Sequence, residues 1–112
     1  MQERSLRSGK KNMEYKIKLT AEFLEEVETI CEYISSNLKN MDASNRLRKK
    51  IMYNVFLLES SPRMFAEIEK TDKTKRFYRR FVIDNYVVLY TIDEIKKIIY
   101  ISHVYYGGKN YM

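Results

Sequence analysis

The chain has 112 residues, a mass of 13.6 kDa and a formal net charge of +6, so its length fits a single domain. A hydrophobic content of 45% argues against intrinsic disorder, and Cys31 as the single cysteine excludes a disulfide framework. No apolar run approaches the roughly 18 residues of a membrane span, and residues 1–12 lack the apolar core of a signal peptide, so we expect a cytoplasmic protein.

Charge is distributed in blocks along the chain. Residues 14–32 sum to −4, whereas residues 39–50 and residues 63–80 each sum to +4. Residues 1–13 contribute +3, and residues 84–112 sum to zero. Blocks of this kind predict one acidic and one basic face, or they simply follow the surfaces of individual helices.

The N-terminal stretch MQERSLRSGKKN shows no apolar periodicity. We interpret residues 1–12 as a flexible basic extension, either an extended translational start or a vector-derived remnant, and place one domain at residues 13–112. The functional alternative is a basic arm that becomes ordered on nucleic acid.

The first predicted elements are a strand and a helix. Residues Tyr15 to Leu19 alternate with period two, which indicates a half-buried strand. Thr20 is a suitable N-cap, and the glutamates that follow suit the first turn of a helix. The apolar stripe expected on this helix consists of Phe23, Leu24, Val27, Cys31, Ile34 and Leu38. A buried, inert thiol is the expected role of Cys31.

A second helix is predicted from about Ala43 to the Ser60-Ser61-Pro62 stop, because proline cannot continue the helical ladder. Its inward residues are expected to be Leu47, Ile51, Val55 and Leu58, and its outward residues Arg46, Lys49 and Lys50. The loop between the two helices is short, so they should form an antiparallel hairpin.

Residues 63–75 are polar and irregular, which predicts a loop. Three strands then follow, at about Arg76–Ile83, Tyr86–Ile92 and Ile98–Tyr105, joined by turns of hairpin length. The element order predicts an α+β domain in which both helices pack on one face of a four-stranded sheet.

Most recognisable chemical motifs are absent from the sequence. The glycines, Gly9, Gly107 and Gly108, do not form a phosphate-binding loop, and His103 is the single histidine. We therefore expect no metal site and no cofactor, and we interpret His103 as a hydrogen-bonded structural residue.

Basic and aromatic residues do gather toward the C-terminal half. They are Arg76, Arg79 and Arg80 where the first strand of the meander begins, and Tyr105, Tyr106, Lys109 and Tyr111 where the last strand ends. Arginine binds phosphate and tyrosine stacks on bases. If these residues share one end or face of the sheet, that surface could bind single-stranded RNA. The alternative is that the arginines line a strand end and the tyrosines fill the sheet.

Three stretches give the chain a family resemblance. They are YKIKLTAEFLEEVETICEYI, YRRFVIDNYVVLYTID and IIYISHVYYGGKNY. Their content and order resemble the RelE/ParE superfamily of type II toxin–antitoxin toxins, over about nine tenths of the chain. The resemblance implies an α+β toxin that stabilises plasmids, arrests growth and forms a hetero-oligomer with a cognate antitoxin.

The resemblance also implies two possible targets. RelE-like members cleave mRNA on the ribosome without metal, and their basic and aromatic positions match Arg79, Arg80, Lys109 and Tyr111. Their third strand usually has arginine after the residue matching Tyr86, whereas this chain has Val87. ParE-like members bind DNA gyrase instead, and their long helical hairpin and Val-Val pair resemble this sequence. We therefore predict a non-nucleolytic, gyrase-directed toxin, with a RelE-like nuclease and an inactive antitoxin- or nucleic-acid-binding member as alternatives.

The surface expected to bind the target or partner contains Arg76, Arg79, Arg80, Tyr106, Lys109 and Tyr111. We expect an acidic segment of the antitoxin to cover sheet or hairpin near the three arginines. Neighbours on a strand point to opposite faces, so Arg79 should share the face of Phe77 and Phe81, and Arg80 the other. If the helices cover the first face, Arg80 is the better site candidate and Arg79 a rim residue.

Overall fold

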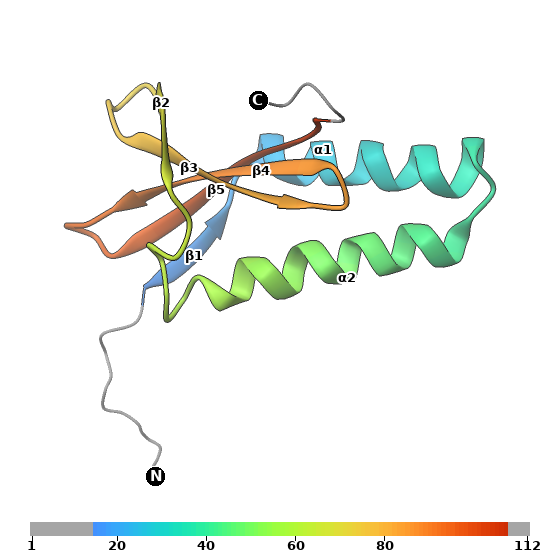
Figure 1. Ribbon diagram of the computed structural model, residues 1–112, viewed down its shortest axis with the longest axis horizontal. Helices are drawn as coiled ribbons and strands as arrows, with labels where there is room; N and C mark the ends of the chain where they lie inside the picture. The colour runs from blue at the N-terminus through green and yellow to red at the C-terminus, as the bar shows by residue number, and fades with distance from the viewer. Residues whose placement is uncertain (1–14, 108–112) are drawn as a thin grey trace, which may run out of the picture.

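The computed structural model describes residues 15–107, so the predicted extension at residues 1–12 lies outside the described range. Figure 1 shows a helical hairpin beside a twisted sheet. The elements, in chain order, are β1 (Lys16–Leu19), α1 (Ala21–Glu32), a π-helical segment (Tyr33–Asn37), α2 (Met41–Leu57), β2 (Glu67–Thr71), β3 (Phe77–Ile83), β4 (Tyr86–Asp93) and β5 (Ile98–Tyr106).

Within residues 15–107 the strands form one sheet in the order β1-β5-β4-β3-β2. Strand β1 pairs in parallel with β5, and the other neighbours are antiparallel. The parallel pair needs a long connection between its strands, which the hairpin and the meander provide. The predicted α+β class, with both helices on one face, is confirmed.

The predicted loop at residues 63–75 is wrong in part, because it contains β2. This edge strand, Glu67–Thr71, pairs with β3 and carries a register irregularity. The sheet of the described residues therefore has five strands rather than the four expected. The sequence EIEKT lacks a strand signature because the strand is mostly exposed, and its backbone is held by pairing with β3.

Side chains cap both helices at their N-termini. The Thr20 hydroxyl accepts a hydrogen bond from the Phe23 amide at 3.1 Å, as its sequence position predicts. Asn40 caps α2 through the Ala43 amide at 3.0 Å, so α2 begins at Met41, slightly before the predicted start. Between the helices, Lys39 has a φ of 54° and reverses the chain.

The core lies between the hairpin and one face of the sheet. All four inward residues predicted for α2 are buried, as are Phe23, Val27, Cys31 and Ile34 of the first stripe. The predictions for Leu24 and Leu38 are wrong, because their exposed fractions are 47% and 57%. Leu24 lies at the edge of its stripe, and the wider π-helical turns rotate Leu38 out of phase with α1.

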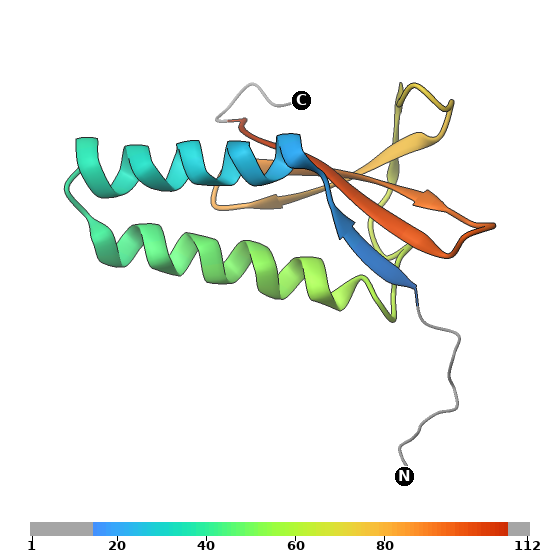
Figure 2. The ribbon, with the colours of Figure 1, turned by 180° about the vertical axis from the view of Figure 1, so that it is seen from behind.

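Figure 2 shows that both helices continue past the end of the sheet, toward the tip of the hairpin. In that part of the hairpin the two helices pack against each other. A buried hydrogen bond joins them, in which Ser44 Oγ donates to the Cys31 carbonyl at 2.9 Å. No helix within residues 15–107 combines the length and apolar character needed to cross a membrane.

Ile51→Ala tests the central contact of the hairpin with the sheet. Ile51 is 0% exposed, so truncation leaves a cavity, and we expect a loss of about 2–5 kcal/mol in the free energy of unfolding. Urea unfolding measures this value, and Lys49→Ala, on the exposed side of α2, should change it by less than about 0.5 kcal/mol. Equal losses in the two variants would contradict the helical phase.

Tyr90 should make stability fall at alkaline pH. Burial raises the pKa of Tyr90 to about 12, and its hydroxyl donates to the Pro62 carbonyl at 2.8 Å. The contribution is fully present below pH 10.0, the ordinary tyrosine value, and is lost as pH rises toward about 12. Relative to Tyr90→Phe, we expect wild type to lose about 1–2 kcal/mol over this interval in urea unfolding. Parallel pH profiles for the two proteins would rule this contribution out.

Candidate functional site

The face of the sheet turned away from the helices carries the candidate site, and we call it the open face. A second apolar cluster, formed by Tyr78, Val87 and Leu89, lies on it, and Ile68 of β2 packs against this cluster. Residues of the opposite parity, such as Phe81 and Tyr90, belong to the core under the helices. The strand pattern therefore separates a packing face from an accessible face.

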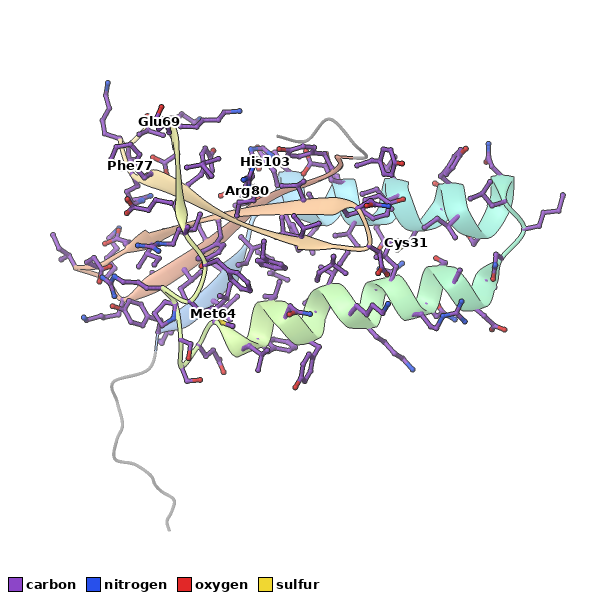
Figure 3. All side chains as sticks on the ribbon, viewed as in Figure 1. Cys31, Met64, Glu69, Phe77, Arg80 and His103 are labelled. Atoms are coloured by element: carbon purple, nitrogen blue, oxygen red, sulfur yellow. The ribbon has the colours of Figure 1, made fainter. Side chains whose placement is uncertain are left out.

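The two adjacent arginines of β3 lie on opposite faces, as their parity predicts. Arg79 donates to the Phe65 carbonyl at 2.6 Å and to Glu67 at 3.3 Å, which fixes it at the rim of the packed face. Arg80 stands opposite Leu89 on the open face, and Leu89 stands opposite His103. One row of the sheet thus brings Arg80 and His103 to the same face, and Figure 3 labels both.

Glu26 of α1 holds His103 in place. His103 Nδ1 lies 3.3 Å from Glu26 Oε2, and the other carboxylate oxygen accepts from the Val104 amide at 2.9 Å. The carboxylate thus ties α1 to β5 beyond the last residue of β1. Its contact with Nδ1 leaves the Nε2 atom of the imidazole for a second partner. The prediction that His103 is hydrogen-bonded agrees with this geometry.

A groove of about 600 Å³ adjoins this row on the open face. It is lined by residues of four strands, the start of α1 with its N-cap, and the β2–β3 turn: Thr20, Glu22, Lys70, Thr71, Asp72, Lys73, Thr74, Arg76, Tyr78, Thr91, Tyr100, Ser102 and His103. Its mixed lining offers cationic groups, hydroxyls and aromatic rings to a polar ligand. The Thr91 hydroxyl has no hydrogen-bond partner among the described residues, although Thr91 is fully buried.

Arg76 closes one end of the groove with its charge already balanced. Its guanidinium lies 3.4 Å from both Asp72 and Asp93, and over the Tyr100 ring at 5.2 Å. Burial alone would raise the pKa of Asp72, but hydrogen bonds from Thr74 and Arg76 hold it below its ordinary value. A hydrogen bond from the Lys96 amide, with the charge of Arg76, lowers the pKa of Asp93. Arg76 is therefore more a structural centre than a ready anion receptor.

The expectation that the basic and aromatic residues gather at one end or face is wrong for Arg76 and Tyr106. Strands β3 and β5 are both antiparallel to β4, so the start of β3 lies beside the start of β5 and far from its end. Arg76 contacts Asp93, whereas Tyr106 stands opposite Tyr86 at the other end of β4. The rings of Tyr106 and Tyr86 meet edge-on, 5.4 Å apart, on the packed face. Lys109 and Tyr111 lie outside the described residues.

Sequence reasoning missed several contacts at the open face. Glu26 and His103 are separated by 77 positions, so no local pattern links them. Tyr100 and Thr91 are adjacent across β4 and β5, and only the register reveals that they line one groove. The one usable signal was the alternation of the strands, which placed Arg80 correctly. Within residues 15–107, histidine, cysteine and carboxylate groups form no cluster that could hold a metal ion.

Comparison with known proteins gives a family and a fold. Residues 17–111 match the family described as the ParE toxin of the type II toxin–antitoxin system parDE. No curated protein sequence is significantly similar to the chain. The chain resembles a structure described as the archaeal RelE-RelB complex from Pyrococcus horikoshii OT3, with a TM-score of 0.59 and 17% identity. That match covers 87% of this chain and 99% of the archaeal one.

Glu26→Ala should weaken the attachment of α1 to β5. The change removes the acceptor of the Val104 amide and the partner of His103, and we expect a loss of about 1 kcal/mol in the free energy of unfolding. Glu25→Ala, one position earlier on the exposed side of the helix, should cost less than about 0.5 kcal/mol. Urea unfolding of both variants checks this, and identical midpoints would mean that the Glu26 contacts carry no net stability.

Proposed function

Because the chain belongs to the ParE toxin family of type II toxin–antitoxin systems, we propose that it arrests growth by binding DNA gyrase and that a cognate antitoxin neutralises it. Its action on the target is non-nucleolytic in this proposal. The chain would act from the cytoplasm, where both gyrase and the antitoxin are made.

The proposal of a non-nucleolytic action is supported mainly by the valine at position 87. RelE-like members usually have an arginine at this position, where its charge can offset the phosphate charge of the transition state. Val87 is 0% exposed and packs in the open-face cluster with Tyr78 and Leu89. A buried valine supplies neither a charge nor a hydrogen bond, so the centre of the open face favours binding over phosphodiester cleavage.

Arg80 is the residue that we propose contacts the target or the antitoxin from the open face. It lies one row of the sheet from Val87, on the face that the helices leave uncovered. Arg79 is a weaker candidate, because it lies at the rim of the packed face, where its guanidinium donates to the Phe65 carbonyl and to Glu67. An acidic target segment would meet the guanidinium of Arg80 beside the buried cluster of the open face.

The antitoxin partner is supported by the archaeal relative, whose description names a RelE-RelB complex. We propose that an acidic segment of the antitoxin covers the sheet near Arg76 and Arg80, and so competes with the target. Arg76 would contribute little net charge to this contact, since Asp72 and Asp93 already neutralise it.

RelE-like mRNA cleavage is the alternative, and the Glu26–His103 pair favours it. A carboxylate that orients an imidazole is a usual arrangement for general acid–base catalysis, and Arg80 lies in the same row of the sheet. This reading would give His103 the proton-transfer role that a nuclease requires. A second alternative is that the chain is an inactive family member that only binds antitoxin or nucleic acid. In that case it would neither inhibit gyrase nor cleave mRNA.

Two assays of the purified chain separate these functions. We expect inhibition of DNA supercoiling by purified gyrase, and intact mRNA after incubation with translating ribosomes. Cleaved mRNA with normal supercoiling would replace the proposal with the nuclease reading. If neither assay shows an effect and induced expression does not arrest growth, the chain is an inactive family member.

Arg80→Ala tests the proposed contact. Loss of a charge-assisted grip costs on the order of 1.5–3 kcal/mol, so we expect the concentration for half-inhibition of gyrase to rise about tenfold or more. The melting temperature of the same variant separates a loss of binding from a loss of folding.

Arg79→Ala is the matched control, because it removes the same charge from the neighbouring position on the other face. We expect Arg79→Ala to lower the melting temperature, because it loses the contacts with Phe65 and Glu67, and to leave the inhibition of gyrase largely unchanged. Full inhibition and normal antitoxin affinity in both variants would show that the pair of arginines is not a binding site.

A further inference from the structure

The helical hairpin carries opposite charges on its two helices. The sequence of α1 holds five glutamates and no basic residue. The sequence of α2 holds one aspartate and four basic residues. The two helices lie side by side, and Arg48 of α2 reaches Glu28 of α1 at 2.5 and 3.2 Å. The charge blocks of the sequence therefore become an acidic strip and a parallel basic strip on one hairpin.

The side of the hairpin turned away from the sheet also exposes apolar groups, and we call it the outer face. Helical phase, together with the Glu28–Arg48 pair, places on it Leu24, Glu25, Glu28 and Glu32 of α1, and Arg48, Lys49, Met52, Tyr53 and Phe56 of α2. Phe56 is 57% exposed and Tyr53 is 66% exposed, and Met52 is half-buried. Exposed rings and leucine beside charged rows are typical of a surface that has a partner.

We infer that this outer face binds the outer face of a second copy of the chain, forming a symmetric dimer with a four-helix core. The inference is independent of the target proposed above. The acidic α1 of one copy would lie on the basic α2 of the other, so opposite charges would face each other at both contacts.

Charge selects the symmetry axis of this dimer. A twofold axis parallel to the helices puts α1 over α2 of the second copy at both contacts. An axis across the helices would instead stack α1 on α1, which brings Glu25, Glu28 and Glu32 of the two copies together. With the first axis, Glu25 and Glu28 approach Lys49 of the second copy. Since Glu28 pairs with Arg48 in an antiparallel hairpin, Leu24 lies level with Met52 and meets it across the interface.

The size of the face limits the strength of the dimer. Helices of 12 and 17 residues are about 18 and 25 Å long, and two adjacent helices are about 20 Å wide. The interface would bury on the order of 1,000 Å² over both copies, at the lower limit for a specific association. We therefore expect a dissociation constant in the micromolar range. Salt should lower the affinity further, because charged pairs contribute to the association.

Sedimentation equilibrium of the purified full chain tests the inference over protein concentrations from about 1 to 100 µM. The monomer mass is 13.6 kDa, and we expect twice this mass to prevail at the upper end in low salt. Lys49→Glu and Glu25→Lys should each weaken association at least tenfold, because each puts like charges at both symmetric contacts. Lys96→Glu, in the β4–β5 turn, makes the same charge change away from the outer face and should leave association unchanged.

Mixing the two weakened variants gives the decisive result. In a heterodimer of Lys49→Glu with Glu25→Lys, both contacts regain opposite charges, so the mixture should associate as wild type does. A monomeric wild type at all concentrations would overturn the inference. So would a mixture that stays monomeric, or single variants that associate normally. Unchanged melting temperatures of the variants would show that folding does not cause the difference.

Discussion

The attachment of the hairpin to the sheet depends on one junction, where β1 ends and α1 begins. Thr20 donates its amide to the Ile101 carbonyl at 3.1 Å, and its hydroxyl reaches the Ile101 and Ser102 carbonyls at 3.1 and 3.0 Å. The same hydroxyl caps α1 through the Phe23 amide. One short side chain thus ends the parallel pair, begins the helix and binds the C-terminal strand. The direction of α1 along β5 follows from these bonds.

Glu26 extends this attachment to the open face. By accepting from the Val104 amide, it supplies a partner for β5 after β1 has ended. Its second oxygen faces His103, so a residue that secures the fold also orients the histidine of the candidate site. Stability and site geometry are coupled here, because one carboxylate serves both. A change at Glu26 therefore reaches the open face through β5 rather than by direct contact with a ligand.

The sheet divides its side chains between two different tasks. One face forms the core under the helices, through residues such as Phe81, Val88 and Tyr90. The other face buries only a small cluster and leaves a groove beside it. The chain belongs to the ParE toxin family, and this uncovered face is where we propose that it binds its partner. The hairpin has a comparable division, with a packed side toward the sheet and a charged, partly apolar side toward solvent.

Local sequence patterns were enough to predict the helices, the three long strands and the opposite orientations of Arg79 and Arg80. Those features depend on local periodicity. The spacing of apolar residues in a helix and the two-residue period of a strand both involve residues that are close together in the sequence. The sequence also indicated the burial of Ile51 and Val55, which lie at the centre of a clear stripe. Leu24 and Leu38 were misjudged, since the edge of a stripe and a π-helical turn depend on packing.

Strand β2, the groove and the Glu26–His103 pair depend instead on contacts between segments that are distant in the sequence. Strand β2 forms because β3 offers it backbone partners, not because EIEKT favours extended structure. The separation of Tyr106 from Arg76 follows from strand direction, which residue types do not encode. Contacts between distant positions arise when register and twist are set by the packed core as a whole. A sequence specifies such contacts jointly, and therefore no single segment of it reveals them.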